Sequence, residues 1–244
     1  MPKFCVILPA AGKSERFGGN EKKTFAKIDG RPIFLRSLEP FMNRDDVCQK
    51  ILAVAPEDME EMKSTFGANL GFMGVQLVEG GARRCDTVRT ALHVVSPDAE
   101  YVAIHDAARP CVTADWINAV FAEAVKSGSA ILAAPIVGTI KRVSPAKVIE
   151  QTVPRIDLYE AQTPQVFRKD IIVSAYAKLG EGADGVTDDA EVVELAGGAV
   201  AVVMADATNL KITTRGDMAL GNAILKARPT KTIRRIGAFE EAQW

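Results

Sequence analysis

Cationic side chains gather near the amino terminus of the chain, at positions that would suit a phosphorylated ligand. Lys13, Arg16 and Lys23 lie within a short stretch and follow small residues at positions 10–12. Small residues let a backbone approach a ligand closely, and successive N–H groups can surround an anion. The apolar run Phe4–Pro9 that precedes them predicts a buried strand. The sequence therefore predicts an anion-binding loop at the carboxyl end of a first strand, where open α/β sheets bind ligands.

Two familiar phosphate motifs do not match this loop. The triplet Gly12-Lys13-Ser14 resembles the end of a P-loop, but that motif needs a second glycine where the chain has Ile7. A G-x-G-x-x-G dinucleotide fingerprint is also missing from this turn. The loop alone is compatible with a phosphate site or with a solvated surface turn.

The elements that position this loop alternate between strands and helices. The expected strands are short and almost continuously apolar, which is typical of parallel strands covered on both faces. They are Phe4–Pro9, Lys50–Ala55, Val75–Val78, Tyr101–His105, Ala130–Ala134 and Ala199–Met204. The expected helices are Pro32–Met42, Glu57–Phe66, Arg84–Val95, Ala114–Lys126, Asp188–Ala196 and Arg215–Ala227. Gly67 is expected to end the second helix. This alternation predicts an α/β fold with a doubly wound, mostly parallel, Rossmann-like sheet.

One segment departs from the alternation. Thr139–Val153 reads as a β-hairpin that turns at Ser144-Pro145-Ala146-Lys147. Because an isolated hairpin is marginally stable in water, it needs a surface to pack on. That surface is either its own domain or a second subunit. We expect a single domain over residues 1–244, with a protruding dimerisation arm at about 138–160.

Composition restricts the class of protein. The chain has 244 residues with a net charge of −1, so no global basic field indicates nucleic-acid binding. Its four cysteines form no C-x-x-C pair, and no apolar run approaches the length of a membrane span. We therefore expect a cytoplasmic protein that binds neither nucleic acid nor membrane.

Motifs farther along the chain carry a family resemblance. Ala10-Ala11-Gly12-x-x-x-Arg16-Phe17 with Lys23 is similar to the opening motif of nucleotidyltransferases. Further matches follow in order: Gly80-Gly81-x-x-Arg84-x-Asp86-Thr87, His105-Asp106-Ala107-Ala108-Arg109-Pro110, Thr139-x-Lys141-Arg142, Thr152-Val153-x-Arg155, Thr163-Pro164-Gln165, Thr187-Asp188-Asp189-Ala190 and Asn209-x-Lys211-x-Thr213. Together, over roughly Phe4 to Ile224, they resemble the 2-C-methyl-D-erythritol 4-phosphate cytidylyltransferases of the non-mevalonate isoprenoid pathway.

The resemblance implies a reaction and its partners. Members of that family make a CDP-alcohol and pyrophosphate from CTP and a phosphorylated polyol, with a divalent cation, expected to be Mg²⁺. The substrate phosphate attacks the α-phosphorus in line and is already anionic at neutral pH, so no general base is needed. Catalysis then depends on positioning and charge neutralisation. A homodimer with arm exchange is implied as well.

The resemblance also assigns residues. It implies catalytic roles for Arg16, Lys23, Arg155 and Lys211. It implies CTP contacts for Ala10, Ala11, Gly12, Lys13, Gly81, Thr87 and Ala107. It implies polyol-phosphate contacts for Asp106, Arg109, Thr139, Thr163 and Thr187, with Asp106 also a candidate metal ligand. Local structural roles compete with some of these: Thr87 could cap a helix, and Asp106 could form an ion pair with Arg109. His105 is expected to be a packed residue at a strand end.

Several positions differ from the family pattern. Lys22 stands where proline is usual, Phe25 where tyrosine is common, and Thr208 where an acidic residue is often found. An alternative activity is a related polyol-phosphate or sugar nucleotidyltransferase, such as a ribitol-5-phosphate cytidylyltransferase, which shares much of the motif set.

Overall fold

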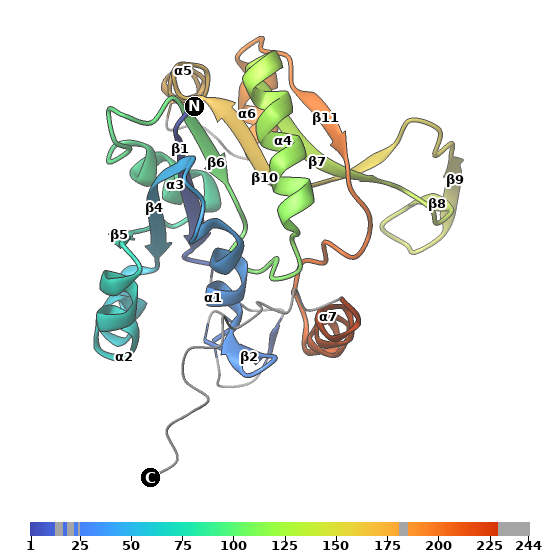
Figure 1. Cartoon of the computed structure of the whole chain (residues 1–244). Coiled ribbons are helices and arrows are strands. Elements are labelled where there is room, and N and C mark those ends of the chain that lie inside the picture. The colour runs from blue at the N-terminus through green and yellow to red at the C-terminus, as the bar shows by residue number, and fades with distance from the viewer. Residues whose placement is uncertain (13–16, 19–21, 24, 181–184, 229–244) are drawn as a thin grey trace.

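A computed structural model describes residues 1–12, 17–18, 22–23, 25–180 and 185–228. Its centre is a seven-stranded sheet in the order β11-β7-β10-β6-β1-β4-β5 (Figure 1). The strands are β1 (Phe4–Ala10), β4 (Val47–Val54), β5 (Val75–Glu79), β6 (Tyr101–Ile104), β7 (Ser129–Pro135), β10 (Tyr159–Arg168) and β11 (Ala201–Met204). All neighbouring pairs are parallel except those of β10, which runs antiparallel to both β6 and β7. The expected doubly wound, mostly parallel sheet is confirmed.

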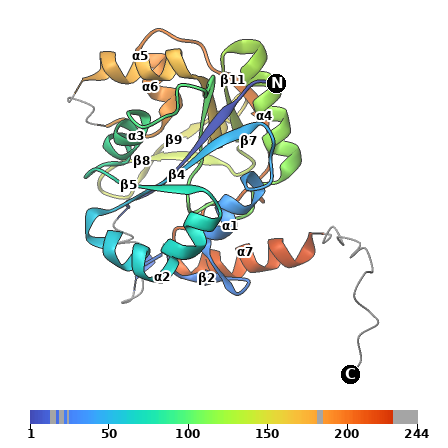
Figure 2. The same cartoon turned by 60° about the vertical axis from the view of Figure 1, so that its left-hand side comes forward.

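Seven α-helices lie within the described residues. They are α1 (Ile33–Leu38), α2 (Met59–Phe72), α3 (Arg84–Leu92), α4 (Ala114–Ser127), α5 (Lys169–Leu179), α6 (Asp189–Leu195) and α7 (Arg215–Ala227). Short 3₁₀ turns at Glu39–Phe41 and Pro56–Asp58 extend α1 and precede α2. A small ribbon of β2 (Lys27–Ile28) and β3 (Arg31–Pro32) lies beside α7 (Figures 1 and 2). None of these helices is long and apolar enough to cross a membrane.

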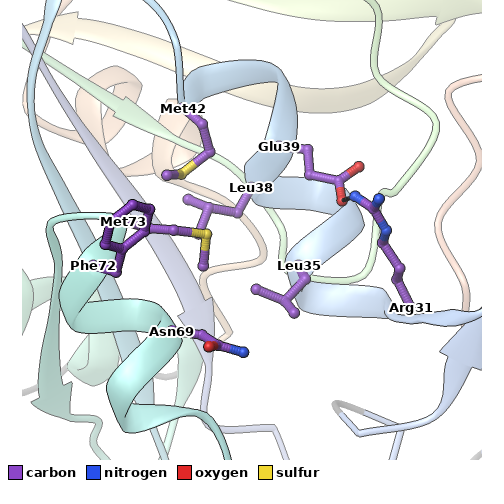
Figure 3. A pocket seen from close by; sticks show the side chains of 8 residues that line it. All are labelled: Arg31, Leu35, Leu38, Glu39, Met42, Asn69, Phe72 and Met73. Carbon is purple, nitrogen blue, oxygen red and sulfur yellow. Dashed lines mark hydrogen bonds and ion pairs between the residues drawn. The ribbon is translucent and has the colours of Figure 1, made fainter. Parts of the chain in front are cut away.

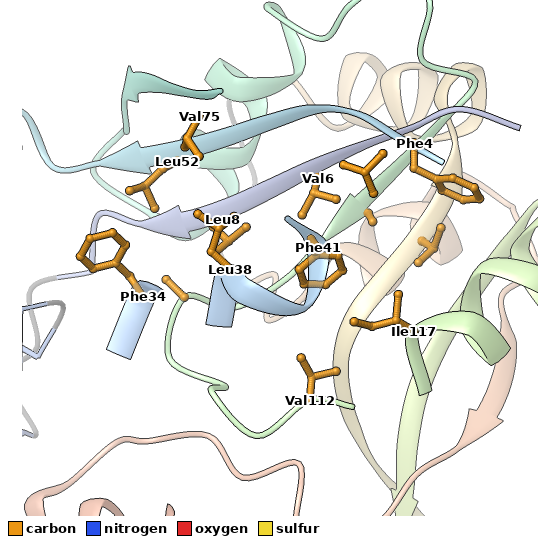
Figure 4. Packing of buried hydrophobic residues seen from close by; sticks show 14 of the residues in the cluster. Phe4, Val6, Leu8, Phe34, Leu38, Phe41, Leu52, Val75, Val112 and Ile117 are labelled. Carbon is orange, nitrogen blue, oxygen red and sulfur yellow. The ribbon is translucent and has the colours of Figure 1, made fainter. Parts of the chain in front are cut away.

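Alternating side chains of β1 divide the core into two layers. Phe4, Val6 and Leu8 pack against α1, α2 and α4 on one face, as Figure 4 shows for part of this cluster. Cys5 and Ile7 pack against α3, α5 and α6 on the other face. A strand buried on both faces has no side that faces water, which explains why β1 is almost continuously apolar.

The order of strands creates a ligand-binding position at the carboxyl ends of β1 and β6. The chain leaves β1 toward β4 and β5 on one side, then returns to β6 on the other side of β1. The chain therefore leaves the ends of β1 and β6 in opposite directions along the sheet, and the crevice at such a reversal of strand order is where open α/β sheets bind ligands. The loop after β1 and the segment starting at His105 flank this crevice.

The sequence-based prediction missed β10, α5 and the short strands β2 and β3, and it placed the end of one helix wrongly. Gly67 does not end its helix, because α2 continues to Phe72 and Gly74, with φ of +63°, follows its end.

The predicted hairpin is present as β8 (Ile140–Val143) paired with β9 (Ile149–Val153). It turns at Ser144–Lys147, where the Lys147 N–H donates to the Ser144 carbonyl at 2.9 Å. Figure 1 shows the hairpin projecting from the sheet beyond β7 and β10.

Candidate active site

The loop after β1 touches the loop that follows β5. Gly80 donates its N–H to the Val54 carbonyl at 2.7 Å, which holds the second loop against the sheet. A Cβ placed on Gly80 would lie 2.6 Å from the Ala11 Cβ, closer than real side chains approach. Only glycine at position 80 therefore lets the two loops touch. The segment predicted to bind the triphosphate and the segment predicted to bind cytidine thus lie against each other.

Thr87 closes the second loop from within. Its buried hydroxyl accepts a hydrogen bond from the Gly81 N–H at 3.1 Å and lies 3.0 Å from the Arg83 carbonyl, to which it can donate. Thr87 does not cap α3, which begins after Arg83 without a side-chain cap; its hydroxyl instead holds the preceding loop. A contact between Thr87 and a nucleotide stays a prediction.

Asp106 follows β6 and is surrounded by three cations. Lys211 Nζ lies 2.8 Å from Oδ2, Arg84 Nε 3.4 Å from Oδ1 and Arg109 Nε 3.6 Å from Oδ2. Burial alone would raise the pKa of the Asp106 carboxyl, but Arg84, Lys211 and Arg109 outweigh burial and hold its pKa well below the ordinary value. Asp106 is therefore ionised at neutral pH.

His105 is a packed residue, as expected, and it orders the loop that carries Asp106. His105 Nε2 lies 3.1 Å from the Arg109 carbonyl, which accepts only, so Nε2 carries the proton. Nδ1 then accepts from Thr163 Oγ1 at 3.0 Å, and the same Thr163 oxygen accepts from the Asp106 N–H at 3.0 Å. Burial is the main cause that lowers the pKa of His105 to about 4, so the ring is neutral.

Polar residues of β10 connect this loop to the segment that carries Lys211. Arg109 donates to the Asn209 carbonyl at 2.7 Å, and Asn209 donates to the Thr163 carbonyl at 3.0 Å. The Ile212 N–H donates to the Ala108 carbonyl at 2.8 Å. Residues that are distant in the sequence thereby hold Asp106, Arg109 and Lys211 together.

A small apolar cluster, separate from the two main layers, supports both sides of the crevice. Its buried members are Phe17, Ala26, Ile28, Ile33 and Ile212, with Leu210, Met218 and Leu225 packed against them. Phe17 lies in the first loop, whereas Ile212 follows Lys211 directly. Helix α7 therefore braces the nucleotide side and the acceptor side at once.

Other predicted residues lie in different surroundings. Lys13 and Arg16 lie outside the described residues. Ala10 and Ala107 are buried, while Gly12 is exposed and Lys23 and Ala11 are partly exposed beside the crevice. Lys22, which replaces the usual proline, forms an ion pair with Asp58.

The structure does not bring all the predicted acceptor-side residues to the crevice. Thr187 is exposed ahead of α6, where its N–H and hydroxyl both donate to Glu191, at 2.7 and 2.9 Å. Thr139 and Arg155 belong to the hairpin region, and the Arg155 guanidinium donates to the Val137 carbonyl. Their predicted roles would need the hairpin region to meet an acceptor site.

The donor set does not favour direct magnesium binding by Asp106. Among the residues that the structure describes, no group of three or more His, Cys, Asp or Glu side chains could hold a metal ion. Both Asp106 oxygens face cations, which disfavours a second cationic partner. A metal role for Asp106 stays a prediction that this geometry does not support.

An apolar pocket elsewhere contains none of the predicted site residues. It lies between α1 and the end of α2 and is lined by Leu35, Leu38, Met42, Phe72 and Met73, with Arg31, Glu39 and Asn69 at its rim (Figure 3). Its lining lacks the clustered cations that a triphosphate requires, so the crevice above β1 and β6 remains the candidate site.

Sequence reasoning gave no role to two residues of the site, Arg84 and Asp189. Arg84 Nη2 lies 2.7 Å from Asp189 Oδ2 while its Nε faces Asp106. Burial alone would lower the pKa of Arg84, but Asp189 and Asp106 raise its pKa above the ordinary value. Both residues occur within recognised motifs, yet no spacing in one sequence indicates that they meet.

Comparison with known proteins identifies a family for the chain. The family model described as 2-C-methyl-D-erythritol 4-phosphate cytidylyltransferase matches residues 4–227. The chain belongs to the 2-C-methyl-D-erythritol 4-phosphate cytidylyltransferase family. A cytidylyltransferase of this name from Rhodopirellula baltica is 41% identical over 90% of the chain and 93% of the relative. Another from Solibacter usitatus is 35% identical over 94% and 98%.

Solved cytidylyltransferases share the fold. The 4-diphosphocytidyl-2C-methyl-D-erythritol synthase of Anaerococcus prevotii superposes with a TM-score of 0.78 at 25% identity, over 92% of this chain and 96% of that one. The 2-C-methyl-D-erythritol 4-phosphate cytidylyltransferase of Thermus thermophilus gives 0.75 at 29% identity, over 91% and 98%. These matches cover more than nine-tenths of this chain.

Proposed function

We propose that this chain transfers a cytidylyl group from CTP to 2-C-methyl-D-erythritol 4-phosphate, giving the CDP-alcohol and pyrophosphate. One observation carries the proposal: the ion cluster of Asp106, Arg109 and Lys211 stands at the strand ends beside the loop after β1. Family membership supplies the identity of the two substrates.

The reaction follows from charge and position. CTP lies with its triphosphate along the loop after β1 and its base against Gly81 and Thr87. The substrate phosphate, held by Arg109 and Lys211, attacks the α-phosphorus in line, and pyrophosphate leaves. Arg16 and Lys23 neutralise the charge that develops at that phosphorus. Asp106 keeps Lys211 and Arg109 pointed into the crevice through its ion pairs.

No side chain needs to take a proton. The neutral His105 ring has both nitrogens engaged inside the protein, so it is not placed to act as a base. Magnesium would be held chiefly by triphosphate oxygens, since it tolerates few protein ligands, and it would offset phosphate charge. The four free cysteines support the proposal that the protein works in the reducing cytoplasm.

The substrates are tested by measuring pyrophosphate release with each ribonucleoside triphosphate and with either 2-C-methyl-D-erythritol 4-phosphate or ribitol 5-phosphate. The proposal expects release with CTP and the methylerythritol phosphate to exceed that of every other pair. Comparable release with ribitol 5-phosphate would favour the related cytidylyltransferase activity. No release with any pair would refute a transferase function.

The hairpin region is proposed to complete the site of a second subunit in a homodimer. Thr139 and Arg155 lie in this projecting region, and it also exposes apolar side chains at Val137, Ile149 and Ile156. Contiguous exposed apolar surface is typical of an interaction site.

A mixing experiment tests the shared site. Neither Lys23→Ala nor Arg155→Ala alone should be active, but an equal mixture of the two should recover about a quarter of wild-type activity. Half of the dimers would be mixed, and each mixed dimer would keep one intact site. Activity no greater than that of the separate variants would show that each subunit supplies its own Arg155.

A further inference from the structure

Arg84 joins two carboxylates that belong to different parts of the fold. It is the first residue of α3, on the nucleotide side of the crevice. Its Nε lies 3.4 Å from Asp106 Oδ1, and its Nη2 lies 2.7 Å from Asp189 Oδ2. Asp189 is fully buried and Asp106 nearly so. One guanidinium thus serves two buried anions with two different nitrogens.

Arg84 thus forms a bridge between Asp106 and Asp189, and hydrogen bonds hold Asp189, on the far side of this bridge, in place. Tyr176 of α5 donates its hydroxyl to Asp189 Oδ1 at 2.7 Å. Gln165 of β10 accepts from the Asp189 and Ala190 N–H groups, both at 3.0 Å, and donates to Asp188 at 2.7 Å. Asp189 is therefore a rigid anchor, and Arg84 transmits its position to Asp106.

The near side of the bridge is the acceptor half of the site. Asp106 holds Lys211 at 2.8 Å on its other oxygen, and Thr187 lies two residues before the anchor Asp189. The positions of Asp106, Lys211 and Thr187, which are expected to face the acceptor phosphate, thus depend on the Arg84 bridge. The planar fork of arginine suits this geometry, because a lysine ammonium is a single point charge that cannot reach along two directions at once.

We propose that Arg84 is a positioning residue that sets the acceptor-phosphate site by holding Asp106 and Asp189 at a fixed separation. The inference rests on the proposed function, because it takes Asp106, Lys211 and Thr187 to face the acceptor. It assigns Arg84 no contact with either substrate.

The test compares Arg84→Lys with wild type and with Arg44→Lys. Arg44 is a matched control, since its guanidinium holds Asp46 through two nitrogens, at 2.9 and 2.6 Å, at the opposite end of the sheet. We expect Arg84→Lys to raise the KM for the polyol phosphate about tenfold while the KM for CTP changes less than about threefold. The control should leave both constants near wild type, with a similar change in Tm.

A second variant keeps the test independent of folding losses. Asp189→Asn removes the anchor charge without changing its size. If Arg84 and Asp189 act as one unit, the double variant Arg84→Lys/Asp189→Asn should raise the KM for the polyol phosphate no further than Arg84→Lys alone. The inference would be overturned if the effects of the two substitutions on the KM for the polyol phosphate multiplied. It would also be overturned if Arg84→Lys left that KM unchanged, or raised the KM values for the polyol phosphate and CTP equally. A wild-type protein without activity would instead refute the proposed function.

Discussion

Neutralising Asp106 should destabilise the protein and at the same time make it bind anions. In Asp106→Asn the shape of the side chain is kept, but Arg84, Arg109 and Lys211 lose the charge that they share. Breaking a buried ion pair by removing one partner typically costs about 3–5 kcal/mol. Because Arg84 and Lys211 are 27% and 38% exposed, solvent screens part of this loss. We therefore expect the lower end of the range, about 3 kcal/mol of unfolding free energy.

Urea unfolding at pH 7 measures this loss. With an m value of about 3 kcal/mol per molar urea for a chain of this size, the midpoint should fall by about 1 M. Sulfate at constant ionic strength should raise the midpoint of Asp106→Asn more than that of wild type, because Lys211, Arg84 and Arg109 then lose their ion pairs with Asp106, although Arg84 keeps Asp189 and Arg109 keeps Glu160. The matched control is Asp170→Asn, whose carboxylate is 66% exposed and pairs with Arg168, and it should cost no more than about 1 kcal/mol.

Two results would refute this reasoning. A midpoint for Asp106→Asn equal to that of wild type would show that the carboxylate is not held by its neighbours. An equal effect of sulfate on both proteins would show that the cations do not form one anion-binding cluster.

Three further perturbations test other parts of the site. Lys23→Ala should lower kcat by about 10²-fold or more in the pyrophosphate assay, as expected for loss of one transition-state donor, whereas the exposed neighbour control Lys27→Ala should not. Gly80→Ala should raise the KM for CTP about tenfold or more, because its Cβ would lie 2.6 Å from the loop after β1; Gly216→Ala, with 3.6 Å of clearance, should be tolerated. The pKa of buried His105 is about 4, against 6.5 in the unfolded chain, so the unfolded state binds more protons between these values. The free energy of unfolding should therefore fall as the pH is lowered from 6.5 to 4. His105→Asn should remove about 3 kcal/mol of that pH dependence in urea titrations, and an unchanged slope would contradict the assignment.

The parallel part of the sheet could be predicted from local pattern, but β10 could not. The parallel strands are apolar on both faces, which a single sequence displays directly. β10 carries Gln162, Thr163, Pro164 and Gln165 in its interior, and a polar run with proline argues against a central strand. These polar side chains are satisfied by distant loops, at Asp206, Asn209 and Asp188. Such partners are invisible before the chain is folded.

Helix α5 illustrates a readable signal that was missed. Ile172, Ala175, Tyr176 and Leu179 recur at helical spacing and pack on the second core layer. In the candidate site, the structure places Arg109 and Lys211 beside Asp106, and the roles that the motifs imply for these residues stay predictions. The motifs could not reveal that Asp106 also binds Arg84, because that contact depends on how α3 meets the end of β6.

The apolar cluster beneath the crevice has a consequence for synthesis of the protein. Phe17 and Ile28 come from the start of the chain, whereas Ile212 and the residues of α7 come from near its end. A ribosome releases these parts in order, so the early residues must wait with apolar surface uncovered until α7 emerges. All seven strands of the sheet are made before α7, but the two sides of the crevice are joined last. A chain interrupted before α7 would therefore retain much of the core and lack the brace that aligns donor and acceptor.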